Sequence, residues 1–155
     1  TLCIISPIIG DYLPPQSRIL KIPILSKLII TLIPNIFFTK RIVPSFINPI
    51  THSKFLANLN AQLHKRRQRN ALLSCFQNLI SKVSANDYSK LNLIKKNIYL
   101  VWGTEDKIVN FNFSQLFIKI VKNCLFFPIK NEGHFVVYEN PQIVYKILYK
   151  LFNFY

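Results

Sequence analysis

The chain has 155 residues, half of them hydrophobic, and 20 Lys and Arg against 6 Asp and Glu give it a formal net charge of +14. This length suits one buried core, and the 17% charged fraction with a mean hydropathy of +0.25 excludes an intrinsically disordered protein. Such a charge is typical of proteins that bind nucleic acid or anionic membranes. The chain is rich in Ile, Asn, Lys, Phe and Tyr and has only 3 Gly and no Met, which indicates a general bias in composition. We attribute most of the positive charge to this bias, because it raises the number of Lys throughout the chain. No specific nucleic-acid partner is therefore predicted.

Cysteine usage and hydropathy indicate the setting of the chain. Cys3, Cys75 and Cys124 are widely spaced and odd in number, which fits neither a metal-binding pair nor a disulfide framework. We expect a reduced, cytoplasmic setting, with membrane association as the alternative. Cys75 lies on an apolar helical face and is predicted to be in the core. We expect no secretory signal at the apolar start, and residues 28–39 are too short to span a bilayer.

The first predicted element is a β-strand over residues 1–9. Leu2 to Ile5 form an apolar run without alternation, which is typical of a strand buried on both faces. Ser6 and Pro7 end the run. Such strands occur in α/β proteins, where helices cover both faces of a parallel sheet.

The next part of the chain predicts short pieces followed by helices. Six prolines between Pro14 and Pro49 exclude long helices and central strands there. Residues 53–83 then repeat apolar residues at helical spacing, interrupted by the basic run His64–Arg69. We interpret that run as a solvated helical face, because it has no aromatic or glycine support for a phosphate site. His52 and His64 have no Cys or carboxylate near them in the sequence, so no metal site is predicted.

Residues Ile19–Phe38 allow two interpretations. The segment is rich in Ile and Leu, and basic residues lie in or beside it: Arg18, Lys21, Lys27, Lys40 and Arg41. Such a segment can lie in a membrane interface and contact anionic head groups. It can equally line an apolar pocket for an acyl group. We favour the pocket wall, with a peripheral membrane contact as the alternative.

The last third alternates strands and helices. Strands are predicted at residues 98–102 and 125–129, with a helix between them at 113–121. Asn140 caps a last helix that begins at Pro141, where a first-turn proline is favourable. A strand, helix and strand in this order predict a right-handed parallel crossover.

Acid–base residues follow both of these strands. Asp106 comes after the first, and His134 comes after the second. Because the carboxyl ends of adjacent parallel strands share one edge of a sheet, we expect these side chains to meet. A carboxylate on the imidazole Nδ1–H fixes its tautomer, as a general base requires. Asp11 is a second candidate acid, interpreted here as a solvated loop carboxylate.

Three other carboxylates of this region are expected to face solvent: Glu105, Glu132 and Glu139. Glu139 would also benefit from the positive end of the last helix.

From Ile98 to Phe152 the chain resembles the C-terminal end of the α/β-hydrolase family. WGTEDKIV is similar to the motif in which a Gly is followed three residues later by the triad acid, the position of Asp106. NEGHFVVYENP is similar to the motif around the triad histidine, the position of His134. LCIISP resembles the strand before the family's cap, and residues 14–93 have the length and helix-rich character of that cap.

The family's nucleophile motif, G-x-S-x-G, is missing from these 155 residues. The glycines are Gly10, Gly103 and Gly133, and none has a Ser two positions away. Ser6 precedes a proline, while Ser74 and Ser81 lie on or beside a predicted cap helix. Since the family's order is nucleophile, acid, histidine, the serine is expected before Thr1.

The resemblance therefore implies an α/β fold, the C-terminal part of an α/β-hydrolase parallel sheet with an inserted helical cap. The expected divisions are 1–15 for a core strand, 16–93 for the cap and 94–155 for the rest of the core. It implies hydrolysis of an ester or other acyl substrate by a Ser-Asp-His triad, with catalytic Asp106 and His134, no nucleophile in this chain, and no cofactor or metal. A small apolar acyl substrate would bind once an upstream segment completes the site, and the chain alone is expected to be inactive. The alternative is a non-catalytic truncated remnant, or a basic piece that binds a membrane or a partner.

Overall fold

The computed structural model describes residues 1–9, 19, 22–32, 39–40, 42–80 and 83–152. The chain divides into two compact units, each described here by itself. Unit 1 comprises Thr1–Pro7, Ser45–Asn48 and Asn86–Tyr155, and unit 2 comprises Ile8–Pro44 and Pro49–Ala85.

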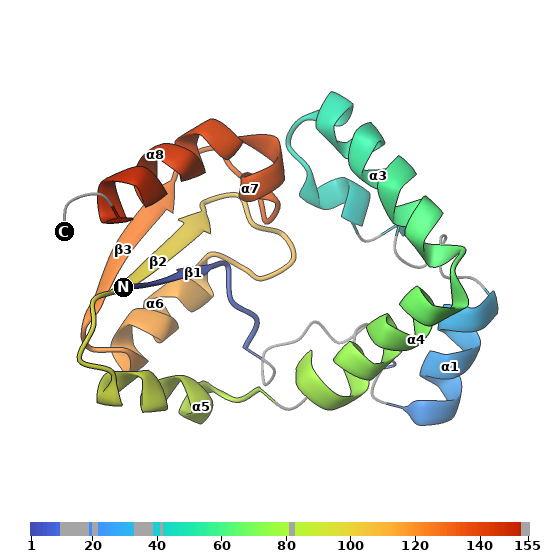
Figure 1. The fold of residues 1–155 in the computed structure, drawn as a ribbon, viewed down its shortest axis with the longest axis horizontal. Helices are drawn as coiled ribbons and strands as arrows, with labels where there is room; N and C mark the ends of the chain where they lie inside the picture. Colours follow the sequence, from blue (N-terminus) through green and yellow to red (C-terminus); the bar gives the residue numbers. More distant parts are fainter. Residues whose placement is uncertain (10–18, 20–21, 33–38, 41, 81–82, 153–155) are drawn as a thin grey trace. The chain divides into compact units, whose positions relative to one another are not determined.

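Unit 1 is built on a three-stranded parallel sheet (Figure 1). Its strands are β1 (Leu2–Ile5), β2 (Ile98–Gly103) and β3 (Cys124–Ile129), in the spatial order β1-β2-β3. Both pairings are parallel. The strands predicted from residues 98–102 and 125–129 are thus confirmed. Because Gly103 pairs with Ile129, the loops that follow β2 and β3 leave the sheet at the same edge.

The central strand β2 is the core of unit 1. Every one of its residues is buried, as expected for an apolar run with a strand on each side. The side chain of Trp102 is fully buried, and its indole N–H donates to the backbone oxygen of Val109 at 3.2 Å. This bond ties the core of the strand to the loop that follows it.

The strand β1 is less buried in this chain than its apolar run predicts. β1 covers only Leu2–Ile5, and all four residues are half-buried. Among the described residues, β1 pairs with β2 alone and forms an edge of the sheet, so one of its sides has no neighbouring strand. An apolar run does not distinguish an edge strand from a central one.

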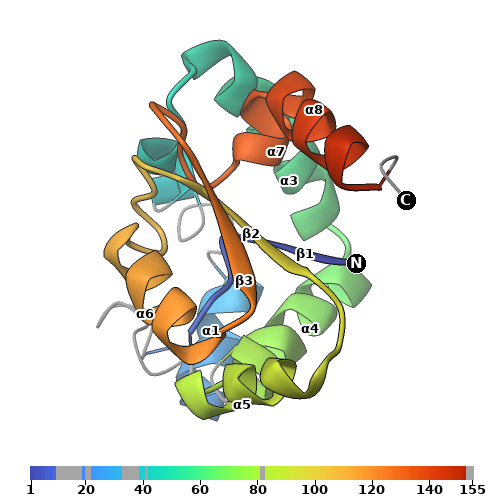
Figure 2. The same cartoon turned by 90° about the vertical axis from the view of Figure 1, so that its left-hand side faces the viewer.

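Helices cover both faces of this sheet. Two short helical elements precede β2, α5 (Ala85–Ser89) and η5 (Lys90–Leu93). The helices that follow β2 are α6 (Asn112–Ile120), α7 (Val136–Glu139) and α8 (Pro141–Phe152). α6 packs on one face and α8 on the other, as both views show (Figures 1 and 2). The expected cap of the last helix is confirmed, since Asn140 Oδ1 accepts a hydrogen bond from the backbone of Ile143 at 3.2 Å.

Unit 2 is helical in its described residues. Its elements are α1 (Pro23–Leu32), η3 (Val43–Ser45, which ends in unit 1), α3 (Pro49–Leu63), α4 (Arg66–Ser74) and η4 (Cys75–Ile80). The helical pattern predicted for residues 53–83 is confirmed as far as Ile80, with a break at the basic run, whereas residues 81–82 lie outside the described residues and Val83 is not helical. There Arg69 Nη1 donates to the backbone oxygens of Leu63 at 2.7 Å and His64 at 2.9 Å. Arg69 thus satisfies the carbonyl groups at the end of α3 instead of serving only as a solvated charge.

The prediction that Cys75 is in the core is wrong, because this residue is exposed. It begins η4, a π-helical turn, whose wider spacing departs from the 3.6-residue period on which the prediction depended. Among the described residues, no helix is both long and apolar enough to cross a membrane.

Candidate functional site

The loops after β2 and β3 are joined by hydrogen bonds. Thr104 N donates to the backbone oxygen of Ile129 at 3.0 Å, and Glu105 N donates to that of Glu132 at 2.9 Å. In return, the Thr104 hydroxyl accepts a bond from Asn131 N at 3.0 Å. These bonds extend the β2–β3 pairing beyond the sheet and hold the Asp106 loop against the His134 loop.

Gly103 permits this close approach. A Cβ atom at this position would overlap the backbone oxygen of Glu132 and lie 2.5 Å from that of Gly133. Any larger residue would push the two loops apart. The glycine recognised in the sequence motif therefore has a steric role at the site.

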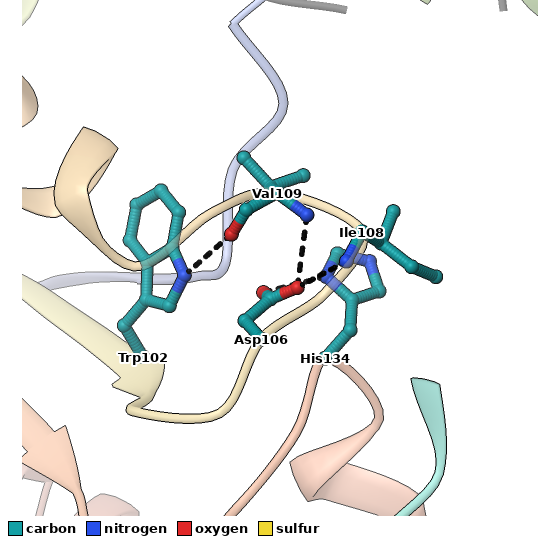
Figure 3. Close-up of polar contacts among 5 residues, drawn as sticks. All are labelled: Trp102, Asp106, Ile108, Val109 and His134. Carbon is teal, nitrogen blue, oxygen red and sulfur yellow. Dashed lines mark hydrogen bonds and ion pairs between the residues drawn. The ribbon is translucent and has the colours of Figure 1, made fainter. Parts of the chain in front are cut away.

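Asp106 is a buried carboxylate with three donors (Figure 3). Its Oδ1 accepts hydrogen bonds from the backbone N–H groups of Ile108 and Val109, both at 2.9 Å. Its Oδ2 lies 2.8 Å from His134 Nδ1. The backbone donors fix the plane of the carboxylate and compensate part of its negative charge.

His134 completes the pair, and the expectation that these two side chains meet is confirmed. An ionised carboxylate only accepts hydrogen bonds, so the proton between the two groups belongs to Nδ1. The His134 side chain is 17% exposed, whereas that of Asp106 is fully buried. In Figure 3 the second ring nitrogen, Nε2, points away from Asp106, and it has no hydrogen bond within the described part of the chain.

The other carboxylates differ from the sequence expectation in two of three cases. Glu105 is exposed, as expected. Glu132 is half-buried and accepts a hydrogen bond from Asn140 Nδ2 at 2.8 Å. Glu139 is half-buried and uses its carboxylate within the protein. Its Oε1 accepts hydrogen bonds from the backbone N–H groups of Ile47 at 2.7 Å and Asn48 at 2.8 Å.

Ser6 is the hydroxyl nearest the end of β1, and its backbone is strained. Its φ is 42°, a left-handed value that is uncommon outside glycine, and it is 5% exposed. Its hydroxyl has no hydrogen-bond partner among the described residues. In the hydrolase elbow the residue after the nucleophile supplies an oxyanion-hole N–H, and Pro7 has none. The structure thus gives no reason to revise the exclusion of Ser6 as nucleophile.

Two further expectations concern acids and metal ligands. Asp11, the alternative acid, lies outside the described residues, as does Gly10. Within the described ranges, no group of three or more His, Cys, Asp or Glu side chains is placed to hold a metal ion.

Comparisons with known proteins identify the fold. No model of a known protein family matches the sequence, and no curated protein matches it. Solved structures do match. An alpha/beta hydrolase from a Medee basin deep-sea metagenome library is 13% identical with a TM-score of 0.70, over 97% of this chain and 55% of its own.

Two further solved structures agree with this match. A 2-hydroxy-6-oxo-6-phenylhexa-2,4-dienoate hydrolase from Rhodococcus sp. strain RHA1 gives 14% identity and a TM-score of 0.69, over 97% of this chain and 54% of its own. The serine hydrolase CCSP0084 from Cycloclasticus zankles is 16% identical with a TM-score of 0.67. The match covers 98% of this chain and 55% of the hydrolase chain. The chain has the α/β-hydrolase fold and spans about half the length of these structures.

Proposed function

We propose that this chain, which has the α/β-hydrolase fold, supplies the acid and the histidine of a serine-hydrolase triad. The observation that carries the proposal is the 2.8 Å contact between buried Asp106 and partly exposed His134 at the carboxyl edge of a parallel sheet. Asp106 holds the ring in the tautomer with the proton on Nδ1, and Nε2 is then free to accept a proton.

The reaction is acyl transfer to a serine that these 155 residues do not supply. His134 Nε2 takes the proton of that hydroxyl as its oxygen attacks the carbonyl carbon of an ester. It then gives the proton to the departing alcohol as the acyl–oxygen bond breaks. A water molecule releases the acid by the same two proton transfers. Asp106 stabilises the imidazolium that forms in each step.

The substrate class and the cap are proposed from the family resemblance of the sequence. We propose a small apolar ester or other acyl compound as substrate, and unit 2 as the cap inserted after the strand β1. Unit 2 occupies the stretch of chain between β1 and β2 where the family carries its cap, apart from the short segment Ser45–Asn48.

The test uses the polypeptide encoded when the reading frame is extended upstream of Thr1 to include a G-x-S-x-G motif. His134→Ala should lower kcat/KM for a p-nitrophenyl ester by at least about 1,000-fold, since a triad acts as a unit. Glu105→Ala removes an exposed carboxylate from the same loop and should leave the rate unchanged. Equal rates for parent and His134→Ala would refute the proposal.

A second candidate function, a peripheral membrane contact, is favoured by α1. Ile24, Leu28 and Leu32 are 77%, 49% and 71% exposed, and they recur every four residues on one side of the helix beside exposed Lys27. Such a face suits an anionic bilayer. Sedimentation with phosphatidylserine vesicles should fall with salt and with serine at the three apolar positions. Equal binding by parent and triple variant would refute it.

A further inference from the structure

We infer that Glu139 is a positioning residue, which holds His134 in its active orientation through the segment Ser45–Asn48. The inference rests on the proposed role of His134 as general base. Asn48 and Glu139 lie 91 positions apart, yet both belong to unit 1. Glu139 is linked to His134 through three successive contacts: a pair of hydrogen bonds, a stack of two rings and an edge-to-face ring contact.

The first contact is a carboxylate on two consecutive backbone N–H groups. Glu139 Oε1 accepts from Ile47 N at 2.7 Å and from Asn48 N at 2.8 Å. Successive N–H groups that point at one anionic oxygen form a small anion-binding nest, and such charge-assisted bonds are among the stronger ones in proteins. The short helix α7 places Glu139 beside these two N–H groups. The backbone N–H of Glu139 donates to the backbone oxygen of Phe135, one turn earlier, at 2.9 Å. The bonds therefore join the segment to the chain just after His134.

The second contact is aromatic. Phe46, next to the bound N–H groups, stacks on Phe135 with ring centroids 4.5 Å apart and planes 12° apart. Phe135 also meets the His134 ring edge to face, at 5.3 Å and 87°. A shift of Phe46 would therefore change the packing of Phe135, the ring that lies directly against the imidazole. Stacked and edge-to-face rings have preferred geometries, so this contact transmits orientation as well as burial.

The segment also lies against the backbone beside His134. A Cβ atom at Gly133 would be 2.6 Å from the backbone oxygen of Ser45 and 3.5 Å from Glu139 Oε2. Gly133 is therefore enclosed by the segment on one side and by Glu139 on another. Glu139 Oε2 is itself buried, and no hydrogen bond to it is found in the described ranges. Burial of this oxygen costs free energy, which the two charge-assisted bonds at Oε1 offset.

The test observes the His134 Nδ1–H proton directly, by NMR of the 155-residue chain with ¹⁵N-labelled histidine. The chain has only 3 His, and His134→Ala identifies the resonance. Glu139→Ala should abolish this downfield signal, because the freed ring exchanges its proton with water. Glu139→Gln keeps an oxygen acceptor for both N–H groups and should retain it. Glu105→Ala is the matched control and should have no effect. Trp102 fluorescence reports that each variant is folded.

A Glu139→Ala chain that keeps both the fold and the unchanged signal would overturn the inference. Should that variant fail to fold, Phe46→Leu decides, because it removes the stacked ring and leaves the carboxylate. It should abolish or shift the signal, and an unchanged signal would overturn the inference.

The same spectra separate this inference from the proposed function. Loss of the signal in Asp106→Asn but not in Glu139→Ala refutes the positioning role and leaves the triad proposal intact. A signal that depends on Glu139, together with esterase activity that does not need His134, refutes the triad proposal alone. A parent chain without the signal contradicts both.

Discussion

Replacing Asp106 by alanine removes one carboxylate that satisfies three donors at once. The backbone N–H of Val109 is buried and that of Ile108 is partly buried, and both would lose their acceptor. A buried donor left unpaired costs about 1–3 kcal/mol. Because Ile108 is open to some water, we expect Asp106→Ala to lower the free energy of unfolding by about 2–4 kcal/mol.

Asp106→Asn is the informative comparison, because asparagine keeps the oxygen that accepts both backbone bonds. Its amide now donates to His134 Nδ1, which moves the imidazole proton to Nε2. The free energy of unfolding should fall by about 1 kcal/mol or less. Catalysis by a completed site should nevertheless fall by about 10,000-fold, the effect of the wrong tautomer in a triad.

Urea unfolding followed by the fluorescence of Trp102, the single tryptophan, measures the stability difference. With a slope of about 2 kcal/mol per M, the Asp106→Ala midpoint should lie about 1–2 M below that of the parent. The Asp106→Asn midpoint should lie close to the parent value. Equal midpoints for the two variants would show that the backbone bonds to Oδ1 contribute nothing to stability, contrary to this prediction.

Two further predictions concern packing and thiol chemistry. Gly103→Ala should lower the free energy of unfolding by about 1–3 kcal/mol or more, because its methyl group overlaps the backbone oxygen of Glu132; an unchanged urea midpoint would contradict this. Burial raises the pKa of Cys3, and burial followed by the proximity of Cys3 raises that of Cys124, so both stay protonated to higher pH, whereas Cys75 is exposed. Iodoacetamide at pH 8 should therefore modify Cys75 first in a mass-spectrometric time course, and faster modification of either of the other two would be the contrary result.

Sequence patterns predicted the part of the fold that depends on local composition. The run Ile98–Trp102 is apolar apart from the Tyr99 hydroxyl, and a central strand buries both faces of such a run. The meeting of Asp106 and His134 followed from the parallel pairing, which brings the ends of β2 and β3 to one edge. Neither inference required knowledge of distant contacts.

The errors come from features that local patterns do not record. The four residues of β1 form an unbroken apolar run, yet all four are only half-buried, because burial depends on which elements pack against the strand. Cys75 is exposed although it continues the apolar helical spacing, and a π-helical turn begins at this residue. The contact of Glu139 with Ile47 and Asn48 spans more than 90 positions, and nothing in the motif around His134 identifies its partner. The segment Ser45–Asn48 lies between Pro44 and Pro49. These two prolines are the one sequence signal that sets the segment apart from its surroundings.

Pre-steady-state kinetics with p-nitrophenyl acetate shows whether the serine that works with Asp106 and His134 lies within these 155 residues. We expect no burst from the chain alone and a burst from the polypeptide extended through G-x-S-x-G, lost in His134→Ala. A burst from the 155-residue chain itself that His134→Ala abolishes would place the nucleophile within the chain and refute the proposed division of the triad.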